Sequence, residues 1–191
     1  MDGLFNDDRS LEEATLLRLY AEGDPRAARQ LVDALLPPVL RYARRMLGDA
    51  AEAEDVAQEA MMRLWRIAPE WRSGEARVST WLYRVTTNLC LDRLRRKGPD
   101  SGLDEVDEPV DPGRPVLDHI QDKLRVDALQ EALFDLPARQ RQAVVLRHIE
   151  GLSNPEIGEI MDISARAVES LTARGKQALS QRLSRRRAEL G

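Results

Sequence analysis

The chain has 191 residues, a net charge of −4 at pH 7, 32% charged residues and one cysteine. Ala, Leu, Arg and Glu dominate, which favours an all-α fold and argues against a β-sheet protein. The lone Cys90 excludes an internal disulfide, and no apolar stretch has the length of a signal peptide or a membrane span. We therefore expect a cytoplasmic protein without direct membrane insertion.

The first part of the chain predicts a bundle of amphipathic helices. Apolar residues recur over residues 11–19 in a helix that ends near Gly23, while residues 1–8 are expected to fray. Asp24-Pro25 begins a second helix, and Pro37-Pro38 predicts a break or kink within it.

A third helix begins at the capping sequence Asp49–Glu52 and carries an apolar stripe over residues 53–65. Its other face presents Asp55, Gln58 and Glu59. This exposed polar strip suits a basic partner, although an ordinary solvated helix face has the same pattern.

A loop with turn chemistry follows over residues 71–77, and a basic helix spans residues 79–97. From Arg84 to Lys97 there are five basic residues and one acidic residue, a net of +4. Cations beside aromatic rings are what single-stranded nucleic acid requires. The tryptophans of this region are equally compatible with a core position.

Residues 98–118 differ in composition from the helical segments on either side. They hold seven acidic residues, only Arg114 as a cation, and many prolines and glycines. Such a segment cannot bury a core, so we expect a flexible acidic linker. It divides the chain into helical domains over residues 1–97 and 119–191, which we expect to fold separately.

Residues 136–183 have the pattern of a helix-turn-helix. Pro137 suits the first turn of one helix, Ser153 to Glu156 form a capping box for the next, and Ser164 caps a third. From residue 165 to the end there are seven basic residues and two acidic ones, a net of +5. The outer face of the third helix is thus a candidate for the DNA major groove.

Catalytic chemistry is hard to build from this sequence. His119 and His148 are the only histidines, neither has metal or triad spacing with Cys90, and no glycine-rich phosphate loop occurs. We expect no enzyme activity, no metal and no cofactor.

Three motifs in this order resemble a bacterial RNA polymerase sigma factor of the extracytoplasmic-function (ECF) group. They are residues 54–59 with Leu64-Trp65, residues 79–84 with Asn88, and residues 136–171. The resemblance covers nearly the whole chain and implies a region 2-like domain, a tether and a region 4-like helix-turn-helix domain.

The resemblance also implies roles for individual residues. Asp55, Gln58 and Glu59 would dock on the clamp helices of the largest subunit of core RNA polymerase, and the flap of the second largest subunit would be a further contact. The residues implied for minus-ten DNA are Trp71, Arg77, Trp81, Arg84, Thr87, Asn88 and Arg95. Those implied for minus-thirty-five DNA are Arg166, Glu169, Ser170, Ala173, Arg174 and Lys176.

Sigma factors of this group are commonly restrained by an anti-sigma factor, often membrane-anchored, so such a partner is expected beside core polymerase and promoter DNA. Two departures bear on sequence preference: Glu169 stands where many relatives carry a basic residue, and the loop over residues 72–77 lacks their Gly-Asp. A stand-alone helix-turn-helix regulator, or a sigma-mimicking protein that titrates an anti-sigma factor, remains open as an alternative.

Overall fold

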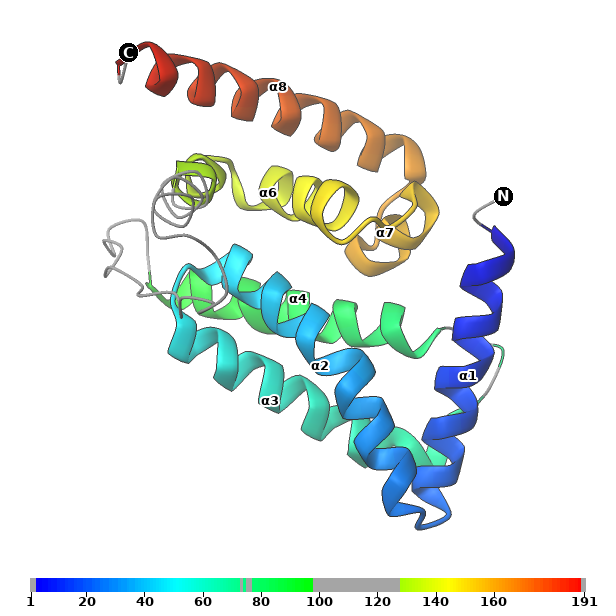
Figure 1. Ribbon diagram of the computed structural model, residues 1–191. Coiled ribbons are helices and arrows are strands. Elements are labelled where there is room, and N and C mark those ends of the chain that lie inside the picture. Colours follow the sequence, from blue (N-terminus) through cyan, green and yellow to red (C-terminus); the bar gives the residue numbers. More distant parts are fainter. Residues whose placement is uncertain (1–2, 73, 75–76, 98–127, 190–191) are drawn as a thin grey trace, which may run out of the picture.

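The computed structural model describes residues 3–72, 74, 77–97 and 128–189, and all regular secondary structure within these ranges is helical (Figure 1). We call residues 3–97 the N-terminal half and residues 128–189 the C-terminal half. The N-terminal elements are α1 (Gly3–Ala21), α2 (Pro25–Leu47), α3 (Ala50–Ile67), η1 (Ala68–Glu70) and α4 (Val78–Lys97). The C-terminal elements are a helical segment over residues 128–134, α6 (Ala138–Val144), the π-helical turn η2 (Val145–Ile149), α7 (Asn154–Met161) and α8 (Ala165–Glu189).

The N-terminal half is a bundle in which α2, α3 and α4 pack on one another and α1 packs on α2 and α4. Its core includes Leu17, Leu31, Leu64 and Leu82, all fully buried. The predicted helix boundaries hold at Asp24, which caps α2 through a 2.8 Å bond from the Arg26 N–H, and at Asp49, which caps α3. α1 begins at Gly3, earlier than the sequence predicts.

Of the predicted break or kink at Pro37-Pro38, the break does not occur, because both prolines lie inside one continuous α2; the kink stays a prediction. A proline in a helix interior typically costs about 3 kcal/mol. Leu31 and Leu35 before the prolines and Val39 after them are buried in the same cluster. Burial of such side chains contributes about 1.5–3 kcal/mol each, enough to offset the cost of the prolines and keep α2 continuous.

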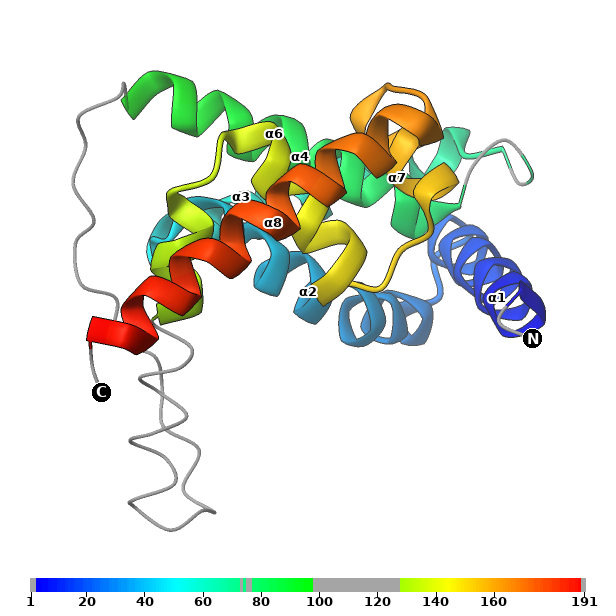
Figure 2. The ribbon, with the colours of Figure 1, turned by 90° about the horizontal axis from the view of Figure 1, so that it is seen from above.

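The C-terminal half confirms the predicted helix-turn-helix. Ser153 and Glu156 form the capping box of α7, and the Ala167 N–H donates to Ser164 Oγ at the start of α8. The helix expected through Ile149 is α-helical only to Val144 and ends in the π-helical turn. Figure 2 shows α8 crossing over α6, with its C-terminal end far from α1.

Two glycines allow close packing in this half. A Cβ on Gly175 of α8 would lie 2.6 Å from Val144 Cγ2 of α6. A Cβ on Gly158 of α7 would lie 2.7 Å from the Ile163 carbonyl oxygen, in the turn before α8. At position 158, only glycine leaves room for the backbone of this turn.

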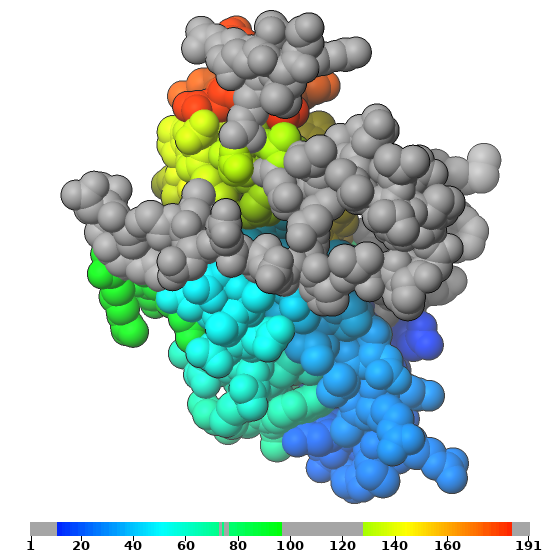
Figure 3. Space-filling model, turned by 60° about the vertical axis from the view of Figure 1, so that its left-hand side comes forward, coloured from blue at the N-terminus to red at the C-terminus, as the bar shows by residue number. Residues whose placement is uncertain are grey.

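The two halves pack against each other, which the division into separate domains does not predict. Tyr42, Met46 and Cys90 of the N-terminal half share one buried cluster with Leu133 and Ile157 of the C-terminal half. In Figure 3 the C-terminal half, yellow-green to red, lies on the N-terminal half, blue to green. The expected linker over residues 98–118 lies outside the described residues.

We predict that Gly158→Ala destabilises the protein by about 1–3 kcal/mol, because the added methyl group meets a backbone carbonyl that cannot move away cheaply. Helix propensity alone predicts the opposite sign, since alanine is favoured over glycine by about 1 kcal/mol. Urea unfolding measures the difference, with the exposed neighbour changed in Glu159→Ala as the control. A Gly158→Ala variant as stable as wild type would contradict this packing.

Candidate nucleic-acid interface

The polar strip predicted on α3 is present. Asp55 and Gln58 are exposed and Glu59 is partly exposed, because the opposite side of α3 packs Ala53, Val56 and other residues into the core. The hydrogen bond that Arg63 Nε donates to Glu59 at 2.8 Å lowers the pKa of the Glu59 carboxyl. The Glu59 carboxylate of the strip is therefore ionised at neutral pH.

An apolar groove of about 350 Å³ lies beside this strip, between α2 and α3. Its apolar lining residues are Val32, Leu36, Leu40, Ala57 and Met61, and its polar ones are Glu54 and Gln58. A groove of this kind accepts the apolar face of a partner helix. The sequence signal was the recurrence of Leu36 and Leu40 one turn apart, which is indistinguishable from core spacing.

The aromatic loop residue Trp71 is half-buried beside α4. Its ring meets the Trp81 ring edge-on, with centroids 6.0 Å apart and planes at 85°. Arg77, at the other end of the loop, forms an ion pair of 2.9 Å with Glu156 of α7. Residues 73, 75 and 76 of the predicted minus-ten loop lie outside the described residues.

On α4 the predicted residues divide between two faces. Trp81, Arg84, Asn88 and Arg95 are spaced at three, four and seven residues, so they share one side of the helix. Arg84, Asn88 and Arg95 are exposed and Trp81 is partly exposed. Together they form an outward surface with cations, an amide and an aromatic ring.

Thr87 does not belong to this surface. It is 2% exposed, and its hydroxyl forms a hydrogen bond of 2.8 Å with the Tyr42 hydroxyl of α2. Burial keeps the pKa of Tyr42 well above its ordinary value, so this phenol stays protonated. A direct DNA contact by Thr87 does not fit this structure, because the side chain lies about a quarter-turn of the helix away from Asn88.

The third predicted surface lies on α8, whose inner side is anchored by fully buried Val168. All six residues predicted for minus-thirty-five DNA are exposed: Arg166, Glu169, Ser170, Ala173, Arg174 and Lys176. Arg174 Nε also donates to the Ser170 carbonyl of the preceding turn. The face therefore carries two guanidinium groups, a hydroxyl and a carboxylate at successive helical turns.

Metal binding, the Cys90 thiol and membrane-spanning helices can be considered within the described ranges. They contain no cluster of three or more His, Cys, Asp or Glu side chains placed to hold a metal ion. Cys90 is buried, and burial raises the pKa of its thiol to about 12, so it remains protonated in the core. None of the described helices has both the length and the apolarity to cross a membrane.

The chain matches Sigma-70 region 2 over residues 31–99 and Sigma-70, region 4 over residues 127–179. It is 34% identical over 177 residues to the ECF RNA polymerase sigma factor SigW of Bacillus subtilis (strain 168), covering 87% of this chain and 94% of SigW. The chain is an ECF sigma factor. A further relative of this sigma factor is SigM of Mycobacterium tuberculosis (strain ATCC 25618 / H37Rv), at 34% identity over 173 residues with 90% and 84% covered.

Solved structures share the fold of this sigma factor. CnrH in complex with the cytosolic domain of CnrY gives a TM-score of 0.70 at 23% identity, covering 91% of this chain and 97% of CnrH. The sigma factor RpoE, in complex with the anti-sigma factor NepR from Bartonella quintana, gives 0.68 at 21% identity, covering 82% and 96%.

We predict that Thr87→Val in this sigma factor costs about 1–3 kcal/mol of stability, because the buried Tyr42 hydroxyl loses its partner. Once the fraction of folded protein is accounted for, its DNA binding should equal that of wild type. Asn88→Ala should show the reverse, with unchanged stability and weaker binding of minus-ten DNA. Denaturant unfolding and oligonucleotide titration test the pair, and a DNA defect in Thr87→Val alone would contradict the assignment.

Proposed function

We propose that this sigma factor docks on core RNA polymerase through Asp55, Gln58 and Glu59 together with the adjacent apolar groove. The observation that carries the proposal is the combination of an acidic strip and an apolar groove on one exposed side of α2 and α3. A partner helix with apolar residues for the groove and cations for the strip would satisfy both, which is the role proposed for the clamp helices. The flap of the second largest subunit remains a proposed further contact.

The basic surfaces would then bind promoter DNA. Trp81, Arg84, Asn88 and Arg95 suit single-stranded minus-ten DNA, because cations bind phosphates and aromatic faces accept unpaired bases. Arg77 and Trp71 lie at the edge of this surface. The exposed face of α8, with Arg166 and the other residues named above, suits the major groove of the minus-thirty-five element, where Arg can bond guanine bidentately.

Reading both promoter elements at once requires the two halves to separate. The elements lie about 25 base pairs apart, roughly 85 Å of B-DNA at about 3.4 Å per base pair. α8 packs on α7, which packs on α4, so at 8–10 Å per helix packing the axes of α8 and α4 come within about 20 Å of each other, far less than the distance between the promoter elements. The 31 peptide steps from Lys97 to Ala128 can reach about 100 Å, enough to span the promoter.

The packed arrangement also occupies part of the minus-ten surface, because Glu156 holds the Arg77 guanidinium where a DNA phosphate would bind. An anti-sigma factor that stabilised this arrangement, or covered the strip on α3, would restrain the protein. Such a partner, whether membrane-anchored or not, fits the control expected from the sequence. Sigma factors are initiation factors rather than enzymes, and work with polymerase on promoter DNA would place this one in the cytoplasm.

We predict that Asp55→Ala combined with Gln58→Ala weakens binding of core polymerase at least tenfold, since both side chains lie in the proposed contact and neither supports the core. Helicity and unfolding temperature should stay at wild-type values. Gln30→Ala, an exposed glutamine of α2, is the matched control. Unchanged affinity of the double variant, measured by fluorescence titration with core enzyme, would rule out this dock.

The ion pair between the halves yields a second prediction. Arg77→Ala should weaken binding of minus-ten DNA to the isolated protein. Glu156→Gln should strengthen it about two- to fivefold, because the pair is partly exposed and of modest energy. Glutamine retains the capping box of α7, so the fold is preserved. If the two substitutions change DNA affinity in the same direction, Glu156 does not compete with DNA for Arg77.

A further inference from the structure

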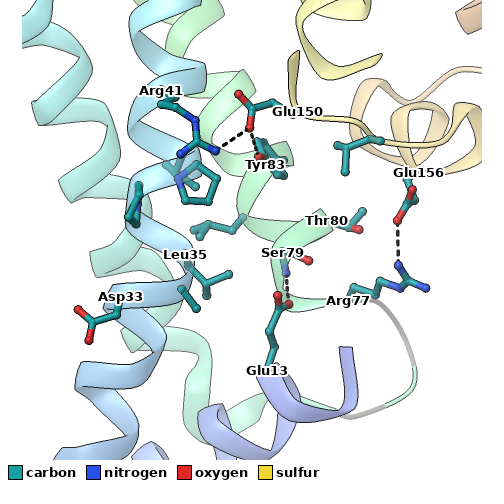
Figure 4. Close-up of a pocket in the computed structure, with 16 residues that line it drawn as sticks. Glu13, Asp33, Leu35, Arg41, Arg77, Ser79, Thr80, Tyr83, Glu150 and Glu156 are labelled. Atoms are coloured by element: carbon teal, nitrogen blue, oxygen red, sulfur yellow. Dashed lines mark hydrogen bonds and ion pairs between the residues drawn. The ribbon is translucent and has the colours of Figure 1, made fainter. Parts of the chain in front are cut away.

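Glu13 of α1 is a buried carboxylate at the beginning of α4. Its residue is 5% exposed, and Glu13 Oε2 accepts a hydrogen bond of 3.1 Å from the backbone N–H of Ser79, the second residue of α4. Figure 4 shows the Glu13 side chain reaching from α1 to this N–H at the edge of the cavity between the halves.

This contact places a hydrogen-bond acceptor at the N-terminus of α4. The first N–H groups of a helix have no partner within the helix, and its N-terminus carries a partial positive charge. The first turn of α4 contains no acidic residue, and the residue before it is Arg77. Glu13 therefore provides an acceptor and a negative charge at this end of α4 from a distant part of the sequence.

α1 also packs against the chain at the other end of the minus-ten loop. Fully buried Leu17 of α1 belongs to one cluster with Ala68, which precedes the loop, and Val78, which follows it. Tyr20 of α1 packs on Trp65 of α3 with ring centroids 4.4 Å apart. α1 thus contacts the chain on both sides of the loop.

We propose that Glu13 is a positioning residue for minus-ten DNA binding. By fixing the first turn of α4, it sets the position of Arg77 and Trp81, and through the ring contact with Trp81 that of Trp71. This inference rests on the minus-ten surface proposed above. It assigns a function to a helix that precedes the Sigma-70 region 2 match, which begins at residue 31.

The test measures binding of a single-stranded oligonucleotide by polymerase holoenzyme. The oligonucleotide carries the nontemplate minus-ten sequence of a promoter that wild-type holoenzyme selects from a random library. Glu13→Ala should weaken its binding roughly fivefold, the order expected for a lost charge and hydrogen bond at a helix N-terminus. Glu13→Gln should recover part of the loss, because its amide oxygen still accepts from Ser79.

Affinity for core polymerase should be unchanged in both variants, and Glu12→Ala, the exposed neighbour on α1, should bind the oligonucleotide like wild type. Wild-type binding by Glu13→Ala would overturn the proposal. So would equal losses of oligonucleotide and core binding without recovery in Glu13→Gln, which would indicate general destabilisation.

Arg84→Ala and Asn88→Ala separate this inference from the function on which it rests. If they weaken oligonucleotide binding and Glu13→Ala does not, the minus-ten surface stands and the role of Glu13 is wrong. If none of these variants changes binding, the minus-ten assignment itself fails.

Discussion

The two halves of this sigma factor are joined where α7 packs on α4 and at the C-terminal end of α2. The last carbonyls of a helix have no partner within it, and cations there are favoured by the helix dipole. Arg141 of α6 donates to the Met46 carbonyl at 2.8 Å, and Gln130 donates to the Arg44 and Arg45 carbonyls. Burial lowers the pKa of Arg141 to about 10, which leaves it protonated at neutral pH.

The chemistry of this junction suits an interface that forms and separates. Its polar contacts, including the bond from the Tyr83 hydroxyl to Glu150, exchange for water at a net cost of about 0.5–1.5 kcal/mol each. Apolar contacts around Met46 and Leu133 supply the remaining attraction. While the halves are joined, the strip on α3 and the face of α8 stay exposed and Arg77 is engaged. Core polymerase can therefore bind the proposed docking surface on α3 before the two halves separate.

Features with local causes could be predicted from the sequence. The Ser153–Glu156 capping box and the inward stripe of α3 follow from residues within one or two helical turns, and both are present. Features that depend on distant residues could not. The continuity of α2 through Pro37-Pro38 depends on a shared core, the inward direction of Thr87 depends on Tyr42, and the acceptor for the Ser79 N–H of α4 comes from Glu13. A solvated helix face and a docking face also share one periodicity, so only the structure reveals the groove beside Gln58.

The most direct test of this account compares the distance between the two halves in the isolated protein with that in a transcribing polymerase–promoter complex. Fluorophores on Arg29→Cys of α2 and Gln181→Cys of α8 would report it, since both positions are exposed and the native Cys90 is buried and protonated. In the isolated protein, energy transfer should report the distance that corresponds to the packed arrangement of the two halves. In a polymerase–promoter complex that produces run-off transcripts, the distance should increase by several tens of ångströms, as promoter elements about 85 Å apart require. A transcribing complex that keeps the distance of the free protein would contradict the account.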